Sequence, residues 1–145
     1  MSLHKEIHLE EEICLSLVGR GWVYEPGVSA QYDRAHALFP EDIIAWVQET
    51  NPKAWAALEK GLAGKAAEVM LDRLRNQLDT RGTLEVLRNG IEIHPVRGTL
   101  HLVQFKPASG MNPDLTVKYN ANRLRVVSFQ RGTRASGTSG NAFPF

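Results

Sequence analysis

The chain has 145 residues, of which 43% are apolar and 23% are charged. This length suits one domain with a sizeable core, and the composition is typical of a globular protein rather than a fibrous or disordered one. No run approaches the roughly 18 apolar residues of a membrane span, and the first residues lack the apolar core of a secretory signal. Because Cys14 is the only cysteine, an intrachain disulfide is excluded and the reducing cytoplasm is the expected compartment.

Charge is divided unevenly along the chain. Residues 1–72 carry six basic and twelve acidic side chains, whereas residues 73–145 carry eleven basic and four acidic ones. The last carboxylate side chain belongs to Asp114, so residues 115–145 contain none. A basic half favours a polyanionic partner such as nucleic acid, although a basic solvated surface explains the same composition equally well.

Apolar periodicity and capping signals predict helices through the first 90 residues. The Asn51-Pro52 pair, for example, combines a preferred cap residue with proline at the first helical position. Gly90 is expected to end the last of these helices in a left-handed conformation. The helices are expected over about 7–20, from 40, from 51, over 65–78 and over 83–88.

The period changes to two after residue 90. Alternation over 91–94 and 99–105 predicts a hairpin that turns at 95–98, with Glu92 opposite His101 and beside His94. Such a cluster suits acid–base work or a metal ion, although the wet face of a two-faced sheet is the more common arrangement.

The remaining segments complete the predicted architecture. A short helix is expected over 112–121, a strand over 124–129, and an irregular tail over 131–145. Helices followed by strands predict an α+β fold, with N-terminal helices preceding a small mixed or antiparallel sheet, in a single domain over 1–130.

Helical geometry singles out Glu10 as a candidate site residue. At 100° per residue, Glu10 falls in the middle of the apolar stripe of the first helix, between Leu17 and Cys14. A carboxylate aimed at a core is costly unless a cation, a metal ion or hydrogen-bond donors satisfy it. An arginine partner in the core, or exposure of this helical turn, would remove the need for a metal.

A second group of candidates lies in the basic half. Lysine and arginine close to amide side chains suit phosphate contacts, and a tyrosine ring stacks on a base or sugar. A solvated basic face is the equal alternative. The predicted DNA-binding residues are Lys118, Tyr119, Asn122, Arg123 and Arg125.

Six collinear motifs carry a resemblance to a known family. In this order they resemble the N-terminal region of the restriction (R) subunit of type I restriction-modification enzymes, over about residues 6–127. The motifs are Leu9-Glu10-x-x-Ile13-x-x-x-Leu17-x-x-x-Gly21-Trp22, Tyr32-Asp33-Arg34-Ala-x-Ala-Leu38, Glu49-Thr50-Asn51-Pro52-x-Ala-Trp55, Arg81-Gly82-Thr83-Leu84-x-Val86-Leu87-Arg88-x-Gly90, Phe105-x-Pro107-Ala108 and Tyr119-x-Ala121-Asn122-Arg123-Leu124-x-Val126-Val127.

This resemblance implies a PD-(D/E)xK-type, RecB-like endonuclease domain that acts on double-stranded DNA. In the family, that domain stands ahead of ATP-dependent translocase motor domains, and the full subunit works with modification and specificity subunits. The glutamate of the first helix contributes there to a Mg²⁺ site. Glu10 matches this position, so the resemblance implies that it is a metal ligand and a catalytic residue; ATP would enter only through motor domains absent from this chain.

The sequence also departs from the family. There, the strand matching Leu124–Val127 continues to an Asp, and a following strand carries Glu-x-Lys, but no carboxylate follows Asp114 here. Hydrolysis of a phosphodiester with Mg²⁺ requires several oxygen ligands and a positioned lysine, which Glu10 alone does not supply. We therefore expect an incomplete fragment that does not cut DNA by itself. The competing hypothesis is a non-catalytic module that contacts DNA or docks a subunit.

Overall fold

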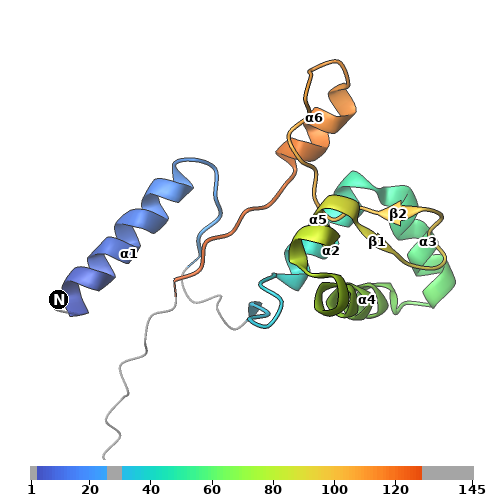
Figure 1. The fold of residues 1–145 in the computed structure, drawn as a ribbon, viewed down its shortest axis with the longest axis horizontal. Coiled ribbons are helices and arrows are strands. Elements are labelled where there is room, and N and C mark those ends of the chain that lie inside the picture. The colour runs from blue at the N-terminus through green and yellow to red at the C-terminus, as the bar shows by residue number, and fades with distance from the viewer. Residues whose placement is uncertain (1–2, 26–30, 129–145) are drawn as a thin grey trace, which may run out of the picture. The chain divides into compact units, whose positions relative to one another are not determined.

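The computed structural model describes residues 3–25 and 31–128. In these ranges six helices accompany one two-stranded antiparallel sheet, which confirms an α+β-like arrangement dominated by helices (Figure 1). The chain divides into two compact units, of which the first contains the described residues 3–25 and 126–128 and the second contains 31–125. A single domain over 1–130 stays a prediction, and the predicted tail over 131–145 lies outside the described residues.

The first unit is built on α1 (Leu3–Val18), which begins four residues before the predicted start. Gly21, at φ 91°, follows the helix and lets the chain turn back, so that the Trp22 N–H donates to the Leu17 carbonyl at 3.1 Å. The Val23 carbonyl accepts a backbone hydrogen bond from Val126 at 3.0 Å. Residues 124–128 form no regular strand, so the strand predicted over 124–129 is not found in its described part.

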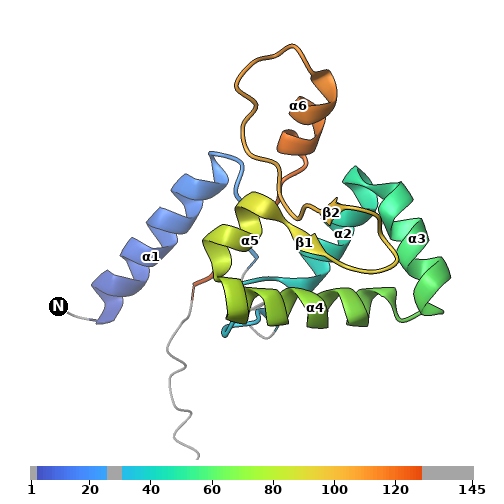
Figure 2. The same ribbon diagram turned by 45° about the vertical axis from the view of Figure 1, so that its right-hand side comes forward.

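The second unit begins with four successive helices, whose starts follow the predicted signals. Pro40 and Pro52 occupy first-turn positions, and the Asn51 side chain accepts a hydrogen bond from the Ala54 N–H at 3.2 Å, which confirms its predicted capping role. The helices are α2 (Pro40–Thr50), α3 (Pro52–Leu62), α4 (Ala66–Arg81) and α5 (Thr83–Asn89) (Figure 2).

A small hairpin closes the core of the second unit. Strand β1 (Ile91–Glu92) pairs antiparallel with β2 (Thr99–Leu100), and the apolar side chains of the hairpin point inward while its polar ones are exposed. Each fully buried apolar side chain of this size contributes about 1.5–3 kcal/mol relative to exposure. The largest fully buried side chains are Val47, Leu58, Met70, Leu74, Val86, Ile91 and Leu100.

The hairpin register differs from the prediction. Glu92 lies opposite Thr99, not opposite His101. The reason is the turn, in which the Val96 N–H donates to the Ile93 carbonyl at 2.9 Å, so the pairing axis falls one residue earlier than expected. The predicted Glu-His-His cluster is therefore wrong, because its carboxylate and its second imidazole do not face each other.

The last helix, α6 (Pro113–Asn120), follows its predicted start. Asn112 caps it by accepting a hydrogen bond from the Asp114 N–H at 3.1 Å. None of its residues is buried. Among the described residues, none of the helices is both long and apolar enough to span a membrane.

Gly90 ends α5 at a position that only glycine suits. Its φ of 68° is positive as predicted, but its ψ of −167° is extended rather than left-handed helical. A Cβ atom at this position would lie 2.5 Å from the Leu100 carbonyl oxygen and 2.7 Å from Cγ2 of Thr99. The strand β2 therefore approaches the backbone of residue 90 too closely for any side chain.

We expect Gly90→Ala to lower the free energy of unfolding by about 2–4 kcal/mol, since it combines backbone strain with overlap against main-chain atoms. Chemical denaturation followed by circular dichroism measures this loss. Gly110→Ala is the matched control, because a Cβ atom there meets nothing within 4 Å. Equal stability of the two variants would contradict the close approach.

Candidate functional site

Glu10 is exposed on α1 and accepts a hydrogen bond from Oγ of Ser128 at 2.9 Å. The expectation that this carboxylate points into a core is wrong, and the alternative of an exposed helical turn holds. The reason is that the apolar stripe around it is itself exposed, with 53% of Leu9 and 50% of Ile13 accessible. Glu10 as a metal ligand and catalytic residue stays a prediction.

An apolar face runs along α1. Besides Leu9 and Ile13, it includes exposed Ile7 and half-buried Leu17. An open hollow of about 250 Å³ lies on this side of the helix, bordered also by Glu12 and other residues of α1 and the segment after it. Helical spacing of this kind normally serves to cover a core, but the described residues leave the stripe largely exposed.

Arg125, predicted to bind DNA, is held inside the second unit. Its Nε and Nη2 donate to the two carboxylate oxygens of Asp42 at 2.5 and 2.9 Å, and its guanidinium lies 4.9 Å from the ring centroid of Phe39. Arg123 also faces α2, with nitrogen–oxygen distances of 3.8 Å to Asp42 and 3.5 Å to Glu49. Both arginines thus serve first to join the segment after α6 to the acidic side of α2.

Asn122 also has a structural task. Its Nδ2 donates to the Gln104 carbonyl at 2.6 Å, and its Oδ1 accepts from the Gln104 N–H at 3.1 Å, so one amide side chain pairs with both backbone groups of that residue. The side chains of Lys118 and Tyr119 make no hydrogen bond or ion pair with other described residues, and the Tyr119 side chain is exposed. Of the five predicted DNA-binding residues, these two keep their polar groups available.

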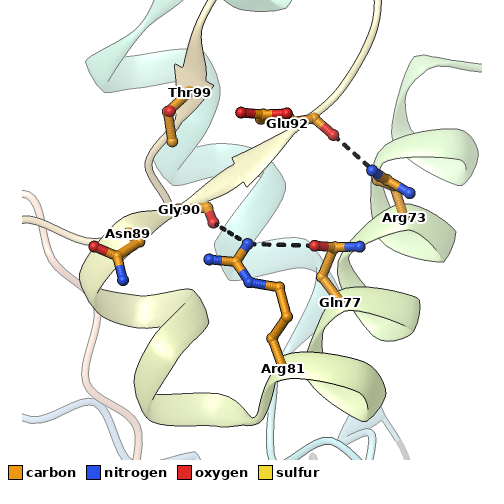
Figure 3. Close-up of a pocket in the computed structure, with 7 residues that line it drawn as sticks. All are labelled: Arg73, Gln77, Arg81, Asn89, Gly90, Glu92 and Thr99. Atoms are coloured by element: carbon orange, nitrogen blue, oxygen red, sulfur yellow. Dashed lines mark hydrogen bonds between the residues drawn. The ribbon is translucent and has the colours of Figure 1, made fainter.

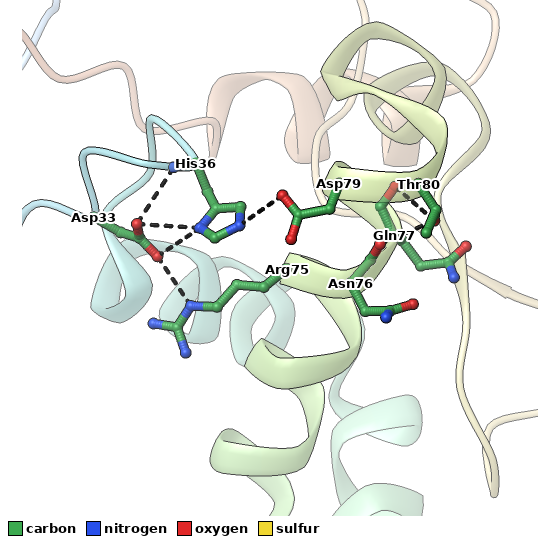
Figure 4. Close-up of polar contacts among 7 residues, drawn as sticks. All are labelled: Asp33, His36, Arg75, Asn76, Gln77, Asp79 and Thr80. Carbon is green, nitrogen blue, oxygen red and sulfur yellow. Dashed lines mark hydrogen bonds and ion pairs between the residues drawn. The ribbon is translucent and has the colours of Figure 1, made fainter.

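A polar cluster missed by the sequence reasoning joins the loop over 31–38 to α4 (Figure 4). The His36 Nδ1 lies 3.1 and 3.2 Å from the two carboxylate oxygens of Asp33, and its Nε2 lies 3.1 Å from Oδ1 of Asp79. The Arg75 Nε donates to Oδ2 of Asp33 at 2.9 Å. Basic and acidic side chains therefore alternate along the cluster, in the order Arg75, Asp33, His36 and Asp79.

The pKa values in this cluster follow from the alternation of charge. Hydrogen bonds to Asp33 and then to Asp79 raise the pKa of His36 above 6.5, because both favour an imidazolium that donates from each ring nitrogen. Burial raises the pKa of Asp33, but hydrogen bonds from Arg75 and His36 outweigh it and leave the pKa below 3.8. Since both nitrogens of His36 are engaged, the ring links the loop over 31–38 to α4.

The sequence contains only half of the signal for this cluster. Asp33 and His36 are three residues apart, and Arg75 and Asp79 are four apart on one helix, spacings that bring side chains together locally. The two pairs are about 40 residues apart in the chain, and they come into contact only because the loop packs on α4. The bridge between Asp33 and Leu38, with backbone hydrogen bonds of 2.9 and 3.2 Å, shapes that loop.

No metal centre occurs in the described ranges, where no group of three or more histidine, cysteine or acidic side chains is placed to hold an ion. Comparisons with protein-family models, with curated proteins and with solved structures found no match for this chain.

His36 makes stability dependent on pH in a defined direction. Because its pKa is raised on folding, its contribution is fully present below about pH 6.5 and is lost as the pH rises through the folded pKa. We expect His36→Gln to remove this loss, so that the variant's stability changes less between pH 5.5 and 8.5 than that of the parent chain. Urea denaturation across this range measures it. His101→Gln, at an exposed histidine, is the control and should leave the parent profile unchanged.

Arg125 should matter for stability. We expect Arg125→Gln to lower the free energy of unfolding by about 2 kcal/mol, because it breaks a bidentate pair and leaves the largely buried Asp42 carboxylate without that partner. Thermal or chemical denaturation measures the loss. Arg88→Gln, at an exposed arginine of α5, is the matched control and should change stability by less than about 0.5 kcal/mol. A DNA-binding defect in Arg125→Gln at unchanged stability would contradict the structural role.

Proposed function

We propose that the chain is an N-terminal fragment of the R subunit of a type I restriction enzyme, and belongs to its cytoplasmic RecB-like nuclease domain. In the full protein, this domain performs Mg²⁺-dependent cleavage of double-stranded DNA, with ATP used by motor domains and with modification and specificity subunits as partners. The six collinear motifs are the observation that carries this proposal.

The roles of motif residues in the fold support the proposal. Asn51 caps α3, Asp33 anchors the His36 cluster, and Asn122 pairs with the backbone of Gln104. Arg81 and Gly90, the two ends of one motif, meet through a hydrogen bond of 3.1 Å from Nη1 to the carbonyl. Each of these motif residues thus has a defined contact in the fold, which is compatible with motifs that a family shares.

The exposed apolar face of α1 supports the proposal that the chain is only a part of the nuclease domain. A fragment that lacks further strands of its sheet should expose apolar surface that those strands would cover. Ile7, Leu9 and Ile13 form such a surface. On this proposal, the surface packs against the remainder of the nuclease domain in the full subunit.

The donor set around Glu10 does not fit a Mg²⁺ ion by itself. Mg²⁺ requires near-octahedral coordination by oxygen, and its sites in nucleases combine carboxylates from several positions with water. Glu10 offers one carboxylate, which already accepts a hydrogen bond from Ser128. On this proposal, the missing ligands come from the Asp and Glu-x-Lys positions of the full family protein.

The purified chain is therefore expected to leave supercoiled plasmid intact in the presence of Mg²⁺. Agarose-gel analysis of nicked and linear products measures this. Any trace cleavage should persist in both Glu10→Ala and Glu12→Ala, since it would come from a contaminant. Robust turnover that Glu10→Ala abolishes and Glu12→Ala leaves unchanged would overturn the proposal of an inactive fragment.

The coding DNA that follows codon 145 tests the family assignment. An Asp followed by Glu-x-Lys, in frame or restored by a single-base shift, would support the fragment of a nuclease. Neither of these in any reading frame, together with no motor-domain sequence further on, would count against it.

A non-catalytic module that contacts DNA or docks a subunit is the second candidate, favoured by the surface of α6. That helix has no buried residue, 67% of Val117 is accessible, and Lys118 and Tyr119 keep their polar groups available. Fluorescence anisotropy with a DNA duplex at 50 and 200 mM salt tests it. Binding by this surface predicts that Lys118→Gln reduces the slope of log affinity against log salt by about one, since one phosphate contact is lost.

A further inference from the structure

A polar cavity of about 380 Å³ lies beside α4, α5 and β1 in the second unit (Figure 3). Its volume is in the range of small-ligand sites, about 300–1,000 Å³. It is lined by Arg73, Gln77, Arg81, Asn89, Gly90, Glu92 and Thr99. We propose that this cavity binds a phosphate group, carried either by a small phosphomonoester or by the backbone of DNA.

Two arginines of α4 give the cavity its charge and are fixed mainly by main-chain carbonyls. The Arg73 Nε donates to the Glu92 carbonyl at 3.0 Å, and the Arg81 Nη1 donates to the Gly90 carbonyl at 3.1 Å. A carbonyl orients a guanidinium without neutralising it, so the charge of Arg73 is not compensated by a described carboxylate, whereas Arg81 also forms an ion pair with Glu85. Preorganised guanidiniums lose little entropy when they bind an oxyanion, which favours affinity.

The remaining contacts leave donors available. Arg73 uses one of its five N–H groups in a bond to the described protein, and the other four have no partner there. Arg81 also donates to Oε1 of Gln77 at 3.3 Å and, through Nη2, to Oε1 of Glu85 at 3.4 Å. That Glu85 oxygen accepts a shorter bond of 2.7 Å from Nδ2 of Asn89, so it is shared.

The two anchoring carbonyls lie close together in the chain. Gly90 and Glu92 are two residues apart at the start of the hairpin, so the two guanidiniums bond neighbouring parts of the backbone. Each guanidinium can offer charge-assisted hydrogen bonds to an oxyanion. A planar carboxylate is satisfied by a single guanidinium fork, whereas phosphate has oxygens for two.

Glu92 is the one carboxylate among the residues that line the cavity. It forms no ion pair with a described basic side chain, since only its backbone carbonyl bonds Arg73. Its charge opposes an anion and limits affinity, as does the charge of Glu85, which forms an ion pair with Arg81 at 3.4 Å. Arg73 is the guanidinium of the lining that has no carboxylate partner among the described residues. Glu92 therefore allows a test of the sign of the ligand's charge. Replacing it with a neutral residue should strengthen the binding of an anion and weaken the binding of a cation.

Nuclear magnetic resonance of the arginine Nε–Hε groups tests the proposal on the full chain in phosphate-free buffer at constant chloride. The probes are inorganic phosphate, deoxyadenosine monophosphate, and a DNA duplex without terminal phosphates. We expect saturable shifts of Arg73 and Arg81 and none of Arg88, which lies on the same unit outside the cavity. Saturation by the monophosphate indicates a small phosphomonoester, and saturation by the duplex indicates the DNA backbone; either result supports the site.

Two variants sharpen the test. Arg73→Gln should weaken binding about tenfold, through loss of one guanidinium, and Glu92→Gln should tighten it about threefold, through loss of repulsion. Arg88→Gln should change affinity by less than about twofold. Thermal unfolding checks that each variant is folded, and the titration of the parent chain decides the question if one is not.

Shifts that grow linearly with every probe, or that affect Arg88 as strongly as Arg73, would overturn the proposal, as would weaker binding in Glu92→Gln. The inference is independent of the proposed nuclease, because that proposal concerns Glu10 in the first unit and is tested by plasmid cleavage. A negative result for the phosphate site would not contradict the proposed nuclease fragment, and the reverse also holds.

Discussion

Burial of the apolar face of α4 is the constraint on which the second unit depends. Met70 and Leu74 are almost completely buried, and this fixes the rotation of the helix. Its polar side chains are then fixed as well: Arg73 reaches β1, Arg75 reaches the loop over 31–38, and the end of the helix approaches the start of the hairpin. Hydrophobic burial thus decides which polar partners meet, and the polar contacts hold the loops.

The uneven distribution of charge has an internal explanation as well as an external one. Asp42 on α2 belongs to the acidic half of the sequence, and Arg125 to the basic half, yet the two form a bidentate pair. Part of the basic surplus therefore stabilises the fold. The charge available to a polyanion is therefore smaller than composition suggests.

Local signals in the sequence were sufficient for much of the fold. Proline and Asn51 predicted where helices begin, and alternation predicted the buried face of the hairpin, because these features depend on neighbours within four residues. The hairpin register depended on a turn that closes at Ile93, and the exposure of Glu10 depended on what covers α1. The exposure of Glu10 is not encoded locally. The turn is local, but the alternation of apolar side chains fits the predicted and the observed register equally well. The His36 cluster was likewise not predicted from the sequence, because its two pairs of residues come into contact only when the loop over 31–38 packs on α4.

Arg81 shows why binding and stability have to be separated at other residues. It closes the connection between α4 and β1 by bonding the Gly90 carbonyl, and Gly90 in turn allows the close approach of β2. Replacing Arg81 would disturb this connection and the cavity wall together, so a loss of binding there would not identify a cause. Arg73 and Glu92 lie on the same wall but are exposed and outside the apolar core. Arg73→Gln also removes a hydrogen bond to the Glu92 carbonyl, so a loss of binding in that variant has a structural explanation as well. A gain of binding in Glu92→Gln is not expected from a loss of structure and therefore indicates the charge of the ligand.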